Sequence, residues 1–128
     1  MSRSAYALMA LASAAGAAGV IESAAAAHGN HDPLLLTSAN FLMIDAAAGI
    51  AISGFALNAP RGRICFLIAG AILIGGGLLF CADLTTRVAS GHRLFPFAAP
   101  IGGTLMIAGW ALAVVTAIGC TIARRKAG

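Results

Sequence analysis

Four long apolar segments occupy most of this chain and leave only short polar connections between them. They run from about Ala5 to Ala27, Leu34 to Leu57, Ile64 to Leu84 and Ala98 to Ala123. Each contains 20 or more residues. At a rise of about 1.5 Å per residue, a helix of that length crosses a hydrocarbon core of roughly 30 Å. Only 9% of the residues are charged, against about 25% in soluble domains, so lipid is the expected solvent.

A bilayer offers no water to pair with backbone amides, and each segment must therefore satisfy its own hydrogen bonds as a helix. The four segments use nearly the whole chain. We therefore predict an all-α integral membrane protein, with residues 1–128 forming a single domain of four transmembrane helices.

The basic residues predict the orientation in the membrane. Six of the eight fall at the two termini and in the second connection, which four spans place on one side: Arg3, Arg61, Arg63, Arg124, Arg125 and Lys126. The other side has Arg87 and Arg93. The positive-inside rule then puts both termini in the cytoplasm. Contact with anionic lipid accounts for the net charge of +4, and no alternation of aromatic and basic residues points to nucleic acid.

The first segment has a second interpretation. A basic start, an Ala/Leu-rich run and Ala25-Ala26-Ala27 resemble a signal peptide with a small-residue cleavage site. Against this, the apolar run is longer than the 7 to 15 residues usual for a signal peptide, and Glu22 lies where a cleavage region avoids charge. We therefore expect residues 1–27 to be retained as the first transmembrane helix.

Ligand-type residues are too sparse to predict a metal, cofactor or redox site. His28, His31 and Asp32 are close together in the first connection, but they lack the ligand set and spacing of a zinc or copper site. The three cysteines lie in apolar segments without a C-x-x-C motif. No nucleophile stands beside a base at a recognisable spacing. We therefore expect neither a cofactor nor an enzymatic activity.

Asp45 is the least expected residue of the sequence. It lies about 11 residues into the second segment, or roughly 16 Å deep, near the middle of the bilayer. A charged residue there costs roughly 2.5 to 3.5 kcal/mol on insertion scales, so Asp45 should face the protein interior and be paired or protonated. It could relay protons or a solute, or it could donate a hydrogen bond that fixes helix packing.

A second polar group is expected near the outer boundary. Asp83 and Arg87 are four residues apart, the spacing at which an acid and a base meet on one face of a helix. Glu22 lies at a similar depth and could join them. The group could lock the helix ends together or form the outer gate of a transport path.

Small residues recur along all four segments and predict close helix packing. We expect packing at Gly19, Gly49, Gly75, Gly102 and Gly103. Trp110 lies in the middle of its span rather than at an interface, and we expect it to fill a gap between helices.

The stretch from Phe80 to Trp110 resembles a known family. Pro100-Ile-Gly-Gly103 followed by Ala108-Gly109-Trp110 is similar to the T-P-x-G-G and G-W pattern of the YgdD/YwdK-like proteins, domain-of-unknown-function family 423. The resemblance implies a small four-span protein of the bacterial inner membrane with no assigned molecular function. This chain has Ala99 where a Thr is usual and Asp45 near an expected family His, so no catalytic residue carries over.

Two functions are consistent with these features. The first is a structural or accessory membrane protein that packs through its small-residue faces, with itself or with a larger complex. The second is a minimal conductor of protons or a small solute, with Asp45 as the relay. Four helices without broken inverted repeats are too few for a complete secondary transporter.

Overall fold

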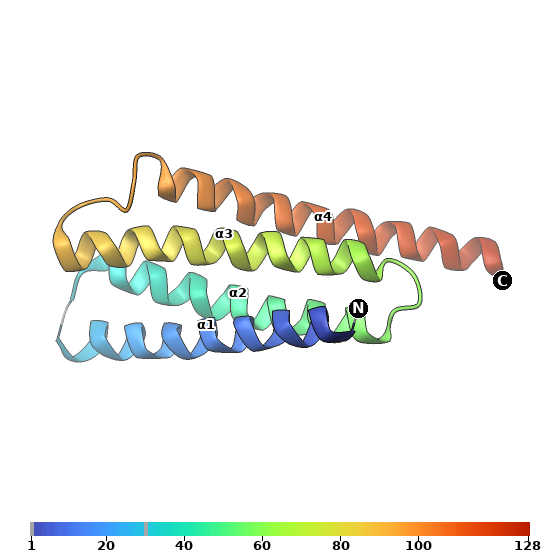
Figure 1. Cartoon of the computed structure of the whole chain (residues 1–128), viewed down its shortest axis with the longest axis horizontal. Coiled ribbons are helices and arrows are strands. Elements are labelled where there is room, and N and C mark those ends of the chain that lie inside the picture. The colour runs from blue at the N-terminus through green and yellow to red at the C-terminus, as the bar shows by residue number, and fades with distance from the viewer. Residues whose placement is uncertain (1, 30) are drawn as a thin grey trace.

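A computed structural model describes residues 2–29 and 31–128, and in these residues the chain is helical with short connections. Helix α1 spans Ser2–His28, α2 Pro33–Asn58, α3 Arg63–Ser90 and α4 Ala98–Ala127. The helices run side by side and alternate in direction, so both ends of the chain lie toward the same end of the molecule (Figure 1). All four are long and apolar enough to cross a membrane. The prediction of an all-α protein with four spans is therefore confirmed.

The helices extend past the apolar segments that predict them. Helix α3 continues from Leu84 through Ser90, and α4 continues through Arg124 to Ala127. Hydrogen bonding within a helix does not stop where the hydrocarbon stops, so polar turns at the boundary can continue it. The polar residues of the third segment, Asp83 to Arg87, consequently all lie on a helix rather than in a loop.

The sequence explains where the helices begin and end. The Asp32 carboxylate accepts a hydrogen bond from the amide of Leu34 at 2.9 Å, and Pro33 occupies the first turn of α2. At the other end of α2, the Arg63 guanidinium donates to the carbonyls of Ala56 at 2.7 Å and Leu57 at 3.0 Å. These bonds satisfy carbonyls that the end of the helix leaves unpaired.

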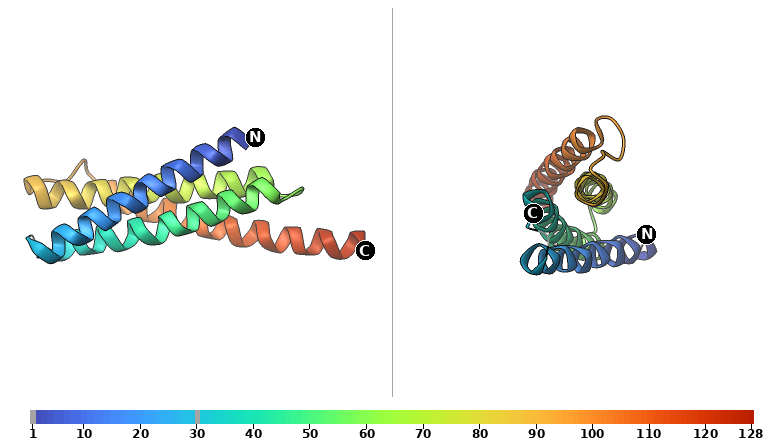
Figure 2. Two further views of the ribbon diagram at one scale, coloured as in Figure 1. Left: turned by 90° about the horizontal axis from the view of Figure 1, so that it is seen from below. Right: turned by 90° about the vertical axis from the view of Figure 1, so that its left-hand side faces the viewer.

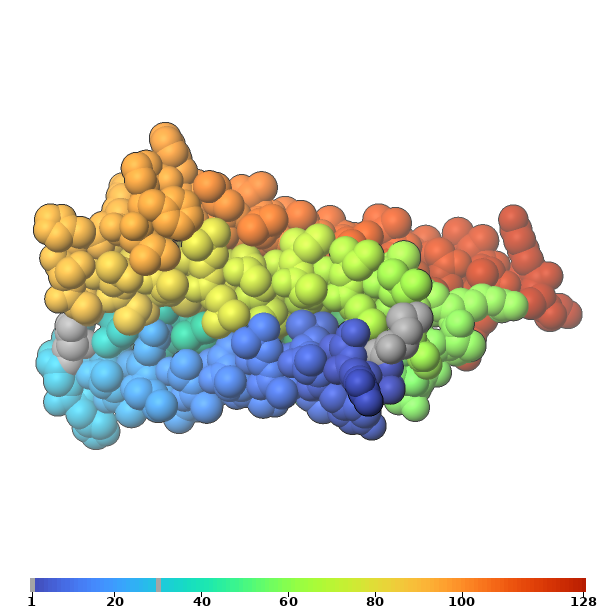
Figure 3. Space-filling view, viewed as in Figure 1, coloured from blue at the N-terminus to red at the C-terminus, as the bar shows by residue number. Residues whose placement is uncertain are grey.

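The helices pack mainly in chain order, and α1 also touches α3. Within the described residues, α1 packs closely on α2, α2 on α3, and α3 on α4, while the backbone of α4 approaches no other helix closely. In the end-on view, α1 and α4 lie on opposite sides of α2 and α3 (Figure 2). The connection between α3 and α4 projects from the side of the molecule (Figure 3). One long side of α4 therefore remains uncovered by the chain itself.

Glycines bring α3 and α4 into backbone contact. A Cβ at Gly102 would lie 2.6 Å from the amide nitrogen of Phe80, and one at Gly76 would lie 2.8 Å from the carbonyl oxygen of Gly102. A Cβ at Gly109 would meet the backbone of Leu73 at 2.8 Å. The two helices can approach this closely only because these positions carry no side chain.

Gly19 and Gly49 lie at interfaces as the sequence indicates. A Cβ at Gly19 would lie 2.9 Å from the Met43 side chain of α2. A Cβ at Gly49 would touch Ala12 of α1 and Ile74 of α3, at 2.9 Å and 2.7 Å. Gly49 therefore marks the point where α1, α2 and α3 meet.

Three other expectations about packing are wrong. The Cβ positions of Gly75 and Gly103 have nothing within 4 Å, so neither glycine permits a close approach within the chain. Their neighbours in the sequence, Gly76 and Gly102, face about 100° further around their helices and form the contact between α3 and α4. Trp110 is 45% exposed and fills no interior gap, because its neighbour Gly109 faces α3 instead.

Candidate functional site

A line of buried polar residues follows one side of α2 through the interior of the molecule. Ser38, Asp45 and Ser53 are all buried. Their spacings of seven and eight residues correspond to about two helical turns, so Ser38 lies within about 20° of Asp45 around the helix and Ser53 about 80° away. The Ser53 hydroxyl donates to the carbonyl of Gly49 at 2.7 Å, so it is satisfied within its own helix.

Asp45 is at the centre of this line. It is the thirteenth of the 26 residues of α2 and only 3% exposed. Its carboxylate lies against Gly77 of α3, where an added Cβ would overlap Oδ2. Among the described residues this Oδ2 has no hydrogen-bond partner. The structure thus places an intramembrane carboxyl group in a space that a missing side chain on α3 creates.

Hydroxyl groups and Glu22 continue the line toward the end of the molecule opposite the termini. Thr85 of α3 donates a hydrogen bond of 2.7 Å to the Glu22 carboxylate of α1. The hydroxyls of Thr85 and Ser38 are 3.4 Å apart, and the Cys81 thiol donates to the Ser38 carbonyl at 3.4 Å. Three helices therefore contribute to one polar cluster, which we call the Glu22 cluster: Glu22, Ser38, Cys81 and Thr85.

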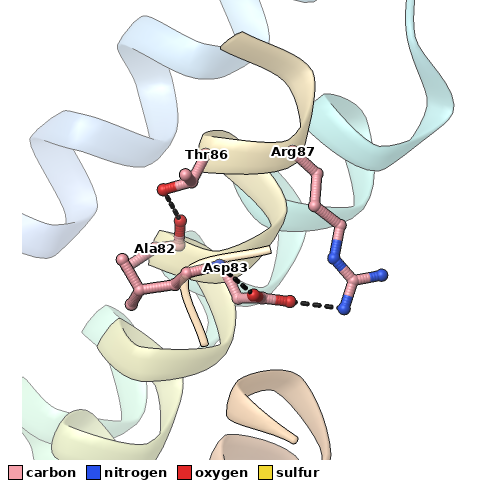
Figure 4. Close-up of polar contacts among 5 residues, drawn as sticks. Ala82, Asp83, Thr86 and Arg87 are labelled. Atoms are coloured by element: carbon pink, nitrogen blue, oxygen red, sulfur yellow. Dashed lines mark hydrogen bonds and ion pairs between the residues drawn. The ribbon is translucent and has the colours of Figure 1, made fainter. Parts of the chain in front are cut away.

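Asp83 and Arg87 form the ion pair that their spacing predicts. Arg87 Nη2 lies 2.5 Å from Asp83 Oδ2, and Asp83 is completely buried. The other carboxylate oxygen accepts a hydrogen bond of 2.8 Å from the amide of Leu94 in the connection to α4. Figure 4 shows the Asp83 carboxylate facing the Arg87 guanidinium. The pair thus ties the end of α3 to the chain that leads into α4.

Glu22 does not join this pair, and the expected outer group divides into two. Glu22 accepts a hydrogen bond from Thr85, whereas Arg87 pairs with Asp83. Thr85 and Arg87 are two residues apart, which separates their side chains by about 200° around α3. One face of α3 therefore contributes Thr85 to the Glu22 cluster. Another face carries the Asp83–Arg87 pair, which binds the connection to α4. A single gate built from Glu22, Asp83 and Arg87 does not match this arrangement.

Sequence reasoning missed Ser38 and Thr85. Serine and threonine are common in transmembrane helices, where each can bond to the carbonyl four residues earlier, and so neither residue stands out by type. A signal for Ser38 was nonetheless present, because it precedes Asp45 by seven residues and therefore shares its face. Thr85 had no such signal until the rotation of α3 was known.

The polar groups of the interior can supply hydrogen bonding and proton exchange. Among the described residues, no three His, Cys, Asp or Glu side chains come together as metal ligands. The cysteines Cys65, Cys81 and Cys120 are unpaired. The groups that meet in the interior are carboxyl, hydroxyl and thiol groups, each able to donate or accept a proton in one of its states.

Comparison with known proteins decides the family. The protein-family model described as "Protein of unknown function (DUF423)" matches residues 12–103, which is 92 of the 128 residues. This chain belongs to the DUF423 family. The match covers most of α1, all of α2 and α3 and the first turn and a half of α4. No curated protein and no solved structure shows a significant match to the chain.

Proposed function

We propose that this DUF423 protein is a structural or accessory membrane protein that packs through α1 against a transmembrane helix of another chain. The supporting observation is the composition of the uncovered side of α1. Ala7, Ala10, Ala14, Ala17 and Ala24 are all exposed; we call this surface the alanine face. Their spacings of three, four and seven residues keep them on one stripe of the helix.

A stripe of small residues is what a partner helix needs in lipid. Lipid tails are as apolar as leucine, so helices associate in a bilayer mainly through close van der Waals packing. Spacings of three and four are also those of a left-handed crossing between two helices. Ile21 occupies the one position of the stripe that carries a large exposed side chain.

The uncovered side of α4 carries more large apolar side chains than that of α1, where Tyr6, Leu11, Val20 and Ile21 are exposed, and this favours α1 as the docking helix. Large apolar side chains cover it: Ile101, Leu105, Ile107, Trp110, Val114, Val115, Ile118 and Ile122. Bulky side chains pack well against lipid tails and hold another helix away. The proposal therefore assigns α1 to a protein partner and most of α4 to lipid.

The proposal includes a location. The six basic residues at the end of the molecule that carries the termini support an orientation with both termini in the cytoplasm, and the family resemblance supports the bacterial inner membrane. Lipid and a second copy or a larger complex are the partners. Docking needs no catalytic group, and the proposal assigns no enzymatic activity.

Gentle extraction of the tagged full chain from its native membrane, followed by native mass spectrometry, tests the proposal. We expect a stoichiometric partner, either a second copy or a larger protein. Ala14→Leu should reduce the fraction of chain recovered with this partner, because the leucine holds the partner helix away from the alanine face.

Ala111→Leu is the matched control, since Ala111 is also exposed and lies on α4. It makes the same change of side chain on the side assigned to lipid and should leave recovery of the partner unchanged. A chain recovered alone, or equal losses from both substitutions, would contradict docking through α1.

A second function is supported by the buried polar line. Asp45, the Glu22 cluster and Ser53 extend along the interior from one end of α2 toward the other. This arrangement favours a minimal conductor of protons or a small solute, with Asp45 as the relay. Conduction requires water molecules or protonated groups to connect Ser38, Asp45 and Ser53, which are about two helical turns apart.

Flux into proteoliposomes with a trapped pH indicator tests conduction. Asp45→Asn keeps the size of the side chain and removes its exchangeable carboxyl proton, so flux should be abolished while folding and expression are kept. Thr116→Val is the control, because Thr116 is a buried hydroxyl on α4 that bonds the carbonyl of Leu112 and lies outside the line; it should leave flux unchanged. Unchanged flux in Asp45→Asn, or loss of folding alone, would eliminate this function.

A further inference from the structure

A groove opens between α2 and α4 at the end of the molecule that carries the termini. It has a volume of about 340 Å³. Phe55 of α2, Phe66 of α3 and Ala117 of α4 form apolar walls, and Arg61 and Arg124 line the same groove. We call it the terminal groove. It exists because the backbone of α4 approaches α3 but not α2.

Side-chain and loop contacts give the terminal groove a defined shape. The rings of Phe55 and Phe66 stack with their centroids 6.4 Å apart. The Cys120 thiol of α4 donates to the carbonyl of Arg61 at 3.5 Å. Gly62 has a positive φ of 79°, and a Cβ there would lie 2.7 Å from the Cys120 sulfur. The connection between α2 and α3 is therefore seated on α4, and it brings Arg61 to the same groove as Arg124.

The two arginines of the groove have no acidic partner among the described residues. The chain has four acidic residues; Asp45 is at mid-membrane, Asp32 begins α2 at the opposite end, and the other two belong to the pairs described above. Arg63, which lies next to the groove, instead donates to the carbonyls at the end of α2. Charge complementarity for Arg61 and Arg124 must therefore come from another molecule.

The depth of these groups indicates what kind of anion fits. The apolar spans end near Leu57 and Ala123, so the two arginines lie at the boundary between hydrocarbon and headgroups. Phe55 and Phe66 lie about one turn further in, and Phe55 is 68% exposed. A ligand that complements the whole groove carries a negative charge at one end and a hydrocarbon chain at the other.

We propose that the terminal groove binds an anionic phospholipid, with its phosphate between Arg61 and Arg124 and an acyl chain along Phe55 and Phe66. Basic pockets between transmembrane helices are suited to anionic headgroups, and guanidinium groups form strong charge-assisted hydrogen bonds with phosphate oxygens. The lipid covers the gap that α4 leaves beside α2. This proposal does not depend on docking through α1 or on conduction.

Native mass spectrometry of the full chain in a neutral detergent tests it, with phosphatidylglycerol as the anionic lipid and phosphatidylcholine as the neutral one. Phosphatidylglycerol should bind more tightly. The double variant Arg61→Gln with Arg124→Gln should bind it roughly 30-fold more weakly, on the basis of about fivefold for each arginine near a membrane surface. The affinity for phosphatidylcholine should change little.

Arg125→Gln with Lys126→Gln is the matched control, because it removes the same charge from the same end of the molecule but outside the residues that line the groove. It should weaken phosphatidylglycerol binding less than about threefold, as expected for a residual surface attraction. Equal losses in the two double variants would overturn the proposal and leave only a general attraction to the basic end.

Two further measurements separate a lipid site from a phosphate site. Ala117→Phe fills the groove without changing its charge, and it should also weaken phosphatidylglycerol binding, while circular dichroism confirms that the exposed position tolerates the ring. Glycerol phosphate added in excess should not displace the lipid, because it lacks an acyl chain. Unchanged binding in Ala117→Phe, or displacement by glycerol phosphate, would overturn the proposal.

Discussion

The two helix pairs of this DUF423 protein achieve close packing in different ways. Between α3 and α4, the Cβ positions of Gly76, Gly102 and Gly109 point at backbone atoms of the facing helix. Between α1 and α2, the nearest atoms to the Cβ position of Gly19 are side-chain atoms of Met43 and Leu42, and the nearest backbone atom, the Ala39 carbonyl oxygen, is 3.1 Å away. A flexible side chain can move away from an added methyl group, whereas the backbone of a helix cannot. We call α1 with α2 the first hairpin and α3 with α4 the second hairpin. A Gly→Ala substitution at the helix contact should therefore lower the free energy of unfolding more in the second hairpin than in the first.

The two hairpins also differ in what they leave uncovered. Helix α1 presents a stripe of alanines and α4 presents a row of large apolar side chains. The pair that is packed most rigidly inside therefore has the outer surface best suited to lipid. The pair that is packed less rigidly has the outer surface best suited to another helix.

The largest effect is expected for Gly102→Ala. The new Cβ would lie 2.6 Å from the Phe80 nitrogen and 2.7 Å from the Gly76 carbonyl oxygen, so α3 and α4 must separate. We expect a loss of about 3 kcal/mol in the free energy of unfolding, measured by reversible unfolding in mixed micelles. Gly103→Ala, one residue along the same helix in open space, is the control, and an equal loss there would contradict the backbone contact.

A loss of about 2 kcal/mol is expected for Asp83→Ala in the same measurement. The substitution leaves the Leu94 amide without its acceptor and Arg87 without its counter-ion. Asp83→Asn retains an acceptor for Leu94 and should lose roughly half as much. If the two variants unfold alike, the bond to Leu94 contributes nothing to the stability of the second hairpin.

A smaller loss of about 1 kcal/mol is expected for Gly19→Ala in the first hairpin. The added methyl group would lie 2.9 Å from Met43 Cγ, and the methionine can adopt another rotamer. It would also lie 3.0 Å from Leu42 Cβ and 3.1 Å from the Ala39 carbonyl oxygen, which only a small shift of the helices relieves. The higher helix propensity of alanine offsets part of the remaining strain. A loss as large as that of Gly102→Ala would show that the two hairpins are equally rigid, and the comparison above would fail.

The smallest effect, and one of opposite sign, is expected for Gly75→Ala. Its Cβ position is open, so only helix propensity changes, and the protein should gain about 0.5 kcal/mol. Gly76→Ala is the contrasting substitution, since its Cβ would lie 2.7 Å from Leu105 Cβ and 2.8 Å from backbone atoms of α4. A destabilised Gly75→Ala variant would indicate a partner on the exposed side of α3.

The sequence predicts the number and the approximate limits of the helices well. Hydropathy decides the spans, Asp32 and Pro33 mark the start of α2, and the spacing of Asp83 and Arg87 predicts their pair. These features depend on residues close together in the chain. They follow from local geometry without knowledge of how the helices are rotated.

The sequence could not predict which face of each helix is buried, that is, how each helix is rotated about its own axis. A helix that is apolar on all sides gives no periodic signal for its buried face. The sequence therefore did not distinguish Gly75 from Gly76, Gly103 from Gly102 or Trp110 from Gly109. The partner of Glu22 was uncertain for the same reason, because the choice between Thr85 and Arg87 depends on which way α3 faces.

The Asp83–Arg87 pair has a consequence for the way this protein enters the membrane. Both charges belong to one helix and are separated by one turn, so α3 carries its own counter-ion into the bilayer. Its acidic group needs no partner from a segment that has not yet been synthesised. When α4 follows, the carboxylate oxygen that faces Leu94 is already in position to hold the returning chain.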